Sequence, residues 1–89
     1  MFEFRAMTRR EKLLARLLSK PKDLTWQELQ TLLSQFGYVW KCSGGSHGRF
    51  ADKDSPEIQI RVCAPHPGNI VKTYQINAVI EHLKERGLI

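Results

Sequence analysis

The chain has 89 residues, of which 42% are hydrophobic and 26% are charged, a composition typical of a folded protein and unlike that of a disordered one. This length allows one domain with a small core, which we place over residues 1–89. Fourteen lysines and arginines against nine acidic residues give a formal net charge of +5, which favours a polyanionic partner, although solubility alone would also account for it.

The sequence also argues against export and membrane insertion. No apolar stretch of signal-peptide length opens the chain, and no segment approaches the roughly 18 apolar residues of a membrane span. The two cysteines, Cys42 and Cys63, are too few for the disulfide framework of a small secreted domain and too far apart for a Cys-x-x-Cys pair. We therefore expect a cytoplasmic protein with reduced thiols.

Two amphipathic helices are predicted ahead of the first strand. Thr8–Glu11 and Thr25–Glu28 each have the spacing of a capping box, in which the two side chains satisfy each other's backbone N–H groups. Leucines recur behind each box at the spacing of one helical face. Pro21 ends the first helix, and Gly37 supplies the left-handed residue after the second.

Three strands are predicted next. From residue 38 the hydrophobic period changes to two, which predicts strands at 38–42, 47–51 and 57–62. The Ser-Gly-Gly-Ser run at 43–46 joins the first two strands, and an Asp-Lys-Asp-Ser-Pro turn precedes the third. Connections this short make the strands antiparallel.

A last helix, from about Thr73 to the Arg-Gly pair at 86–87, completes the order helix, helix, three strands, helix. Such an order packs as a two-layer α+β domain with the helices on one face of the sheet. Side chains alternate along a strand, so the apolar residues of the second and third strands point toward the helices, whereas His47, Arg49 and Arg61 point away. The exposed face therefore carries a histidine and two arginines.

This exposed face suits the cleavage of RNA. A base must take a proton from a ribose 2′-hydroxyl, and histidine is largely neutral yet basic at cellular pH because its ordinary pKa is about 6.5. His47 is the candidate base, and no metal or cofactor is required. Backbone N–H groups next to glycine and cationic side chains would steady the phosphate. The candidates for these contacts are Lys41, Gly45, Ser46, Arg49 and Arg61.

Each of these features also has a simpler structural explanation. His47 can be a surface residue at the start of a strand, and the glycines before it can form a plain hairpin turn. His66, between two prolines, is either an auxiliary catalytic group or, as we favour, a residue that holds the loop before the last helix. We expect His82 to be solvated, and Cys42 to be a small buried hydrophobe rather than a zinc ligand. Four aromatic residues are expected in the core rather than as base-stacking platforms: Trp26, Phe36, Tyr38 and Trp40.

Taken together, the motifs resemble those of the HicA family of bacterial toxins. A Gly-Ser-His run followed by a Pro-His-Pro segment before the last helix is far more specific than either half alone. The likeness spans nearly the whole domain, and the segments that carry it are 25–29, 36–38, 45–50, 65–68, Lys72 and 83–88.

The resemblance implies a fold like that of a double-stranded-RNA-binding domain over residues 25–89, with residues 1–24 as an added N-terminal helix. Members of the family are ribosome-independent mRNA interferases, held inactive by a HicB-like antitoxin, and their catalytic histidine matches His47. Lys72 is what this chain retains of the family's basic run before the last helix. Gly48 stands where many relatives carry a bulkier residue, so we expect a looser orientation of the histidine.

Two alternatives compete with the RNA-cleaving toxin. A domain of this fold can bind RNA without cutting it, by reading duplex shape through phosphate and 2′-hydroxyl contacts. A degenerate toxin can be kept only for binding its antitoxin and operator. Salt-sensitive binding of RNA that stays intact favours the first alternative, and co-purification with an acidic neighbour without nuclease activity favours the second.

Overall fold

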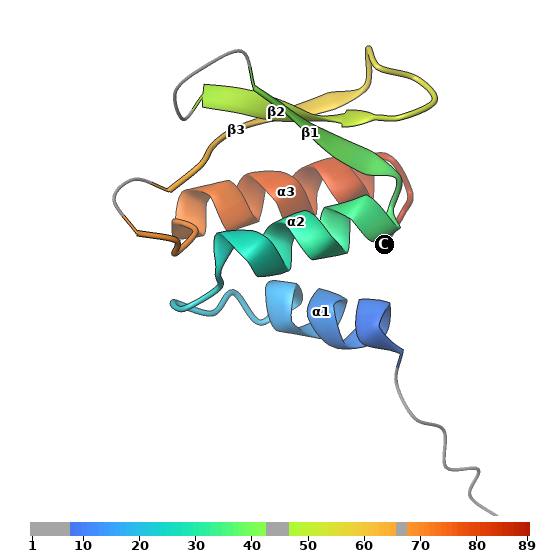
Figure 1. Cartoon of the computed structure of the whole chain (residues 1–89). Helices are drawn as coiled ribbons and strands as arrows, with labels where there is room; N and C mark the ends of the chain where they lie inside the picture. Colours follow the sequence, from blue (N-terminus) through green and yellow to red (C-terminus); the bar gives the residue numbers. More distant parts are fainter. Residues whose placement is uncertain (1–7, 43–46, 66–67) are drawn as a thin grey trace, which may run out of the picture.

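The helices and strands of the chain follow the predicted order in a computed structural model, which describes residues 8–42, 47–65 and 68–89 (Figure 1). The elements are α1 (Arg9–Leu18), α2 (Trp26–Gln35), β1 (Tyr38–Cys42), β2 (His47–Asp52), β3 (Gln59–Cys63) and α3 (Thr73–Glu85). The third strand begins later than predicted because Ile58 still belongs to the preceding turn, where its N–H donates to the carbonyl of Ser55 at 2.9 Å.

Both predicted capping boxes start their helices. The hydroxyl of Thr8 accepts the N–H of Glu11 at 3.1 Å, and the hydroxyl of Thr25 accepts the N–H of Glu28 at the same distance. In each pair the glutamate carboxylate accepts the threonine N–H in return, so the first turns leave fewer unsatisfied donors. Gly37, with φ of +87°, provides the left-handed residue after α2.

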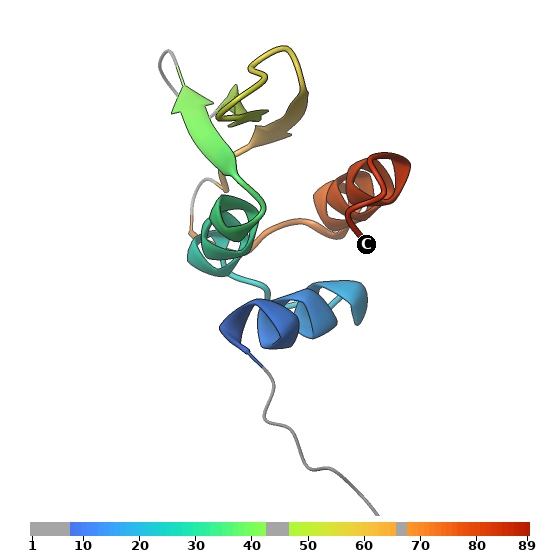
Figure 2. The same cartoon turned by 90° about the vertical axis from the view of Figure 1, so that its right-hand side faces the viewer.

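The three strands form one antiparallel sheet in the order β1-β2-β3, and all helices lie on one side of it (Figures 1 and 2). Helix α2 packs under β1 and α3 under β3, while α1 lies across the other side of both helices. Phe50, Ile60 and Val62 are buried against the helices, as the strand alternation predicted. The α+β fold is confirmed, and among the described residues no helix lies on the opposite face of the sheet.

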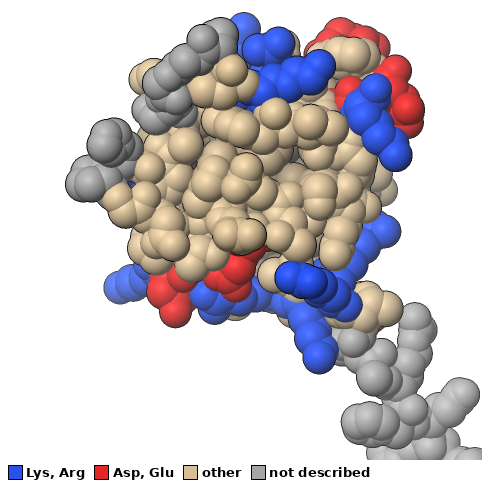
Figure 3. All heavy atoms as spheres, viewed as in Figure 1, with Lys and Arg blue, Asp and Glu red and all other residues tan. Residues whose placement is uncertain are grey.

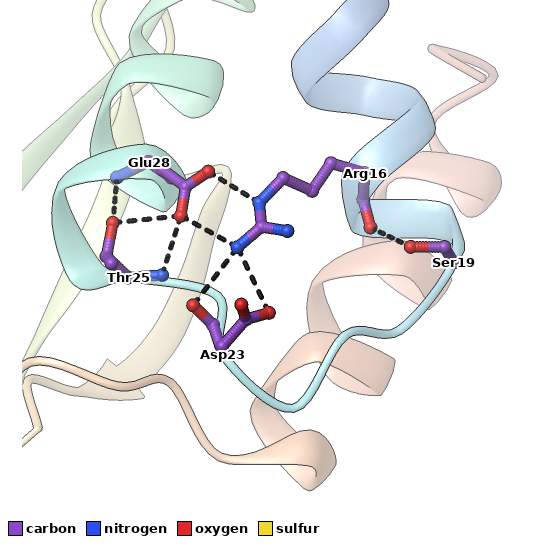
Figure 4. A network of polar contacts seen from close by, with 5 residues as sticks. All are labelled: Arg16, Ser19, Asp23, Thr25 and Glu28. Atoms are coloured by element: carbon purple, nitrogen blue, oxygen red, sulfur yellow. Dashed lines mark hydrogen bonds and ion pairs between the residues drawn. The ribbon is translucent and has the colours of Figure 1, made fainter.

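Helix α1 packs onto this core. Leu17 of α1 is completely buried, and Arg16 beside it reaches the N-terminus of α2 (Figure 4). Its Nε donates to Glu28 Oε2 at 2.5 Å, and its Nη2 donates to the backbone carbonyl of Asp23 at 3.1 Å. The hydrogen bond from Arg16 is the main cause that lowers the pKa of Glu28, the residue that also caps α2.

Within the described residues, no helix combines the length and apolarity that crossing a membrane requires.

The aromatic residues pack on the core, as predicted. Tyr38 is only 2% exposed, the Trp26 and Trp40 rings meet edge to face at 4.9 Å, and Phe36 packs against the hydrophobic core.

The expectation that His82 is solvated was wrong. It is half-buried, and its Nε2 lies 2.8 Å from the hydroxyl of Tyr38, because α3 brings it against β1. Burial is the main cause that lowers the pKa of His82.

Candidate functional site

Three cationic side chains form a row across the face of the sheet that carries no helix. The strand register places Lys41 opposite Arg49 and Arg49 opposite Arg61, and directly opposed residues project to the same side. All three are exposed. Like charges placed opposite one another destabilise a sheet, so an anion bound over this row would relieve an existing repulsion.

Lysines and arginines of the described residues also lie on other parts of the surface. Seen from the side of β1 and α2, lysines and arginines lie along the rim, over the sheet and around α1, while the middle of this side is uncharged (Figure 3). Positive charge is therefore distributed unevenly, and the sheet face is one of the places where it gathers.

A hollow of about 630 Å³ lies beside β3 and the first turn of α3. This volume is within the usual range of ligand sites. The residues that line it include His47, Gly48, Arg49, Arg61, Cys63, Tyr74 and Gln75. The structure thus brings the predicted base and two of the predicted cations to one concave surface.

The imidazole of His47 contacts a cysteine on the neighbouring strand. His47 stands directly opposite Cys63 in the β2–β3 register, and its Nδ1 lies 3.1 Å from the Cys63 sulfur. The thiol of Cys42, on the other neighbouring strand, donates to the backbone carbonyl of His47 at 3.3 Å. The expectation that Cys42 is buried was wrong, because it is the last residue of the edge strand β1 and is exposed there.

The rim of the hollow is held by a buried glutamine of α3. Gln75 is only 5% exposed, yet it is polar, and its side chain makes two hydrogen bonds to the backbone of Cys63. The N–H of Cys63 donates to Oε1 at 2.6 Å, and Nε2 donates to the carbonyl of Cys63 at 3.0 Å. Gln75 therefore pairs with the open edge of β3 as a neighbouring strand would.

Gly48, next to His47, is also tightly surrounded. A Cβ at this position would lie 2.6 Å from both the Lys41 carbonyl and the Trp40 ring. The indole thus occupies the space that a side chain would fill, and only glycine fits. Gly48, which led us to expect a looser orientation of His47, is therefore closely packed against the Lys41 carbonyl and the Trp40 ring.

Comparison with known proteins supplies the family. The profile of HicA toxins of bacterial toxin-antitoxin systems matches residues 26–87. The chain belongs to this family. No significant match is found among curated proteins or among solved structures.

In this HicA-family toxin, the predicted site residues fall into three groups. His47, Arg49 and Arg61 line the hollow. Lys41 belongs to the cationic row but not to the lining, and Lys72, the exposed N-cap of α3, also lies outside it. Gly45, Ser46 and His66 lie outside the described residues.

The lining residues that were not predicted from sequence include Cys63, Tyr74 and Gln75. Cys63 extends the alternation of β3 by one residue past the predicted end, which places it on the same face as Arg61. Gln75 stands four residues before Val79 on the apolar face of α3, a spacing that marks it as a buried polar residue. No comparable signal pointed to Tyr74.

Proposed function

We propose that this HicA-family toxin is a metal-independent endoribonuclease, an mRNA interferase, in which His47 is the general base. One observation carries the proposal most directly: His47, Arg49 and Arg61, which project to the same side of the sheet, line one hollow beside β3 and the first turn of α3. They supply two of the three groups that phosphodiester cleavage requires, a base and cations that stabilise the phosphate, and the third is an acid for the leaving oxygen.

The proposed reaction begins at His47 Nε2, since Nδ1 faces Cys63. Nε2 takes the proton of a ribose 2′-hydroxyl, and the 2′-oxygen forms a bond to the adjacent phosphorus. Arg49 and Arg61 stabilise the charge that builds on the phosphate oxygens. The bond from phosphorus to the 5′-oxygen then breaks, and that oxygen takes a proton from water or from His66. The products are a 2′,3′-cyclic phosphate and a free 5′-hydroxyl.

The remaining predicted contacts serve binding in this proposal. Lys41 extends the cationic row toward β1, so it would contact a phosphate next to the one that is cleaved. Lys72 precedes Tyr74 and Gln75 and would contact the RNA at the other rim of the hollow. Backbone N–H groups at Gly45 and Ser46 would complete the phosphate contacts.

An antitoxin is the partner that the family implies, and we propose that it is HicB-like and covers the hollow. An acidic surface would complement the row of Lys41, Arg49 and Arg61. Charge complementarity speeds the encounter of two proteins, which suits a partner that must silence a toxin quickly.

The test compares purified wild-type protein with a His47→Ala variant on a defined single-stranded RNA. We expect the variant to lose about 10² to 10⁴ fold in rate, because this is what a general base contributes. Lys84→Ala, an exposed cation of α3 outside the hollow, is the matched control and should cut at the wild-type rate.

Other outcomes of this test identify the alternatives. RNA that stays intact with the wild-type protein, together with salt-sensitive binding, would show a non-catalytic RNA-binding module. Stable capture of an acidic antitoxin with no cleavage would show a toxin that is kept only for partner binding. Undiminished cleavage by His47→Ala would remove His47 from the catalytic role.

A further inference from the structure

The only two cysteines of the chain both contact His47, each from a different neighbouring strand. Cys42 on β1 donates to its backbone carbonyl, and Cys63 on β3 lies 3.1 Å from its ring nitrogen Nδ1. The two contacts differ in what they control. The first holds the main chain of β2 and the second holds the imidazole itself.

We propose that Cys63 is a positioning residue for His47: its sulfur accepts the Nδ1–H and thereby leaves the Nε2 lone pair directed to the substrate. This inference rests on the proposed function, in which Nε2 is the base. Histidine has two ring nitrogens, and the hydrogen bond made by one determines which of them carries the proton. A neutral imidazole with hydrogen on Nδ1 is a base at Nε2, whereas the other tautomer is a donor there.

The surroundings of Cys63 support a fixed sulfur. The side chain is half-buried and opposite His47 in the β2–β3 register, so the pair is set by the ladder of the sheet. Gln75, itself buried, holds both backbone polar groups of Cys63. The sulfur is therefore attached to a backbone that is anchored on both edges, by β2 and by α3.

The same contact suits both protonation states of the base. When Nε2 takes a proton from the ribose hydroxyl, the ring becomes an imidazolium with two N–H groups. Nδ1–H is already donated to Cys63, so the ring need not rotate during the transfer. The phosphate contacts are made by other residues, so removal of the sulfur should act on turnover and leave substrate binding unchanged.

The first experiment reads the tautomer of His47 by ¹⁵N NMR at pH 8, with the ring signals assigned by comparison with His47→Gln. We expect hydrogen on Nδ1 in the wild type, a shift toward hydrogen on Nε2 in Cys63→Ala, and retention of the wild-type form in Cys63→Ser. Cys42→Ala is the matched control, because it removes a contact to the backbone and should leave the tautomer unchanged. If Cys63→Ala does not fold, Cys63→Val removes the same polar atom and puts a larger apolar side chain in its place.

The second experiment measures cleavage of a defined RNA by the same variants. We expect kcat to fall about tenfold in Cys63→Ala with KM within twofold of the wild type, as is typical when a partner that orients a catalytic histidine is lost. Cys63→Ser should recover most of this loss. A wild-type ring with hydrogen on Nε2, an unchanged tautomer in Cys63→Ala, or unchanged kcat would each overturn the inference. If the tautomer responds as expected while even the wild type leaves RNA intact, the positioning role stands and the proposed nuclease activity fails.

Discussion

Replacement of Gln75 by leucine tests whether α3 holds the edge of the sheet at the candidate site. The substitution nearly preserves volume and removes both hydrogen bonds to Cys63, of 2.6 and 3.0 Å. Each such bond contributes about 1 kcal/mol net, and a buried backbone group left without a partner costs about 1–3 kcal/mol. Cys63 is half-buried, so water can reach part of its backbone, and we expect a total loss of about 2 kcal/mol.

The assay is thermal and urea unfolding followed by circular dichroism. A loss of about 2 kcal/mol lowers the Tm of a domain of this size by about 8–16 °C. Gln27→Leu, the same change at an exposed position of α2, is the matched control and should stay within about 0.5 kcal/mol of the wild type. A Gln75→Leu variant as stable as the Gln27→Leu variant would refute the assigned role of the two hydrogen bonds.

Three further substitutions or conditions give separate tests. Gly48→Ala should cost about 1–3 kcal/mol in unfolding free energy, since the new Cβ meets the Trp40 ring and a backbone carbonyl at 2.6 Å; wild-type stability in urea would contradict this packing. Burial lowers the pKa of His82 in the folded state below its ordinary value, so the unfolded chain binds protons more readily and stability should fall as pH drops below about 6.5. His82→Gln should lose this part of the pH dependence, measured as the urea midpoint from pH 7.5 to 5.5, and an identical profile in both proteins would refute it. Arg61→Ala should weaken RNA binding and reduce the slope of log affinity against log salt by about 1, and an unchanged slope would show that Arg61 contacts no phosphate.

Much of the fold follows from local patterns. The two capping boxes at Thr8 and Thr25 start their helices at the predicted residues, because the hydrogen bonds that define them lie within four residues of chain. The strand alternation correctly placed Phe50 inward and Arg49 outward, because the side-chain period of a strand is a local property. The end of β3 was predicted one residue short, since a strand end depends on the partner strand.

The site residues likewise include some that local patterns predicted and some whose surroundings only the tertiary structure sets. The sequence predicted His47 from its local motif, and the strand alternation predicted that Arg49 and Arg61 lie on the same face. These three residues line one hollow. The misassigned residues were Cys42, which is exposed at the end of the edge strand β1, and His82, which is half-buried against a residue far along the chain. Tyr38, for example, lies 44 residues from His82.

The sequence by itself determined the order of elements and the exposed face that carries His47, Arg49 and Arg61, because period, capping and family motifs are written in short stretches of chain. Only the tertiary structure decided what holds that histidine. The register of β3 brings Cys63 to the His47 ring, and the packing of α3 brings Gln75 to the backbone of Cys63. These contacts join segments 12 and 16 residues apart, and their geometry is set by the packing of the whole core.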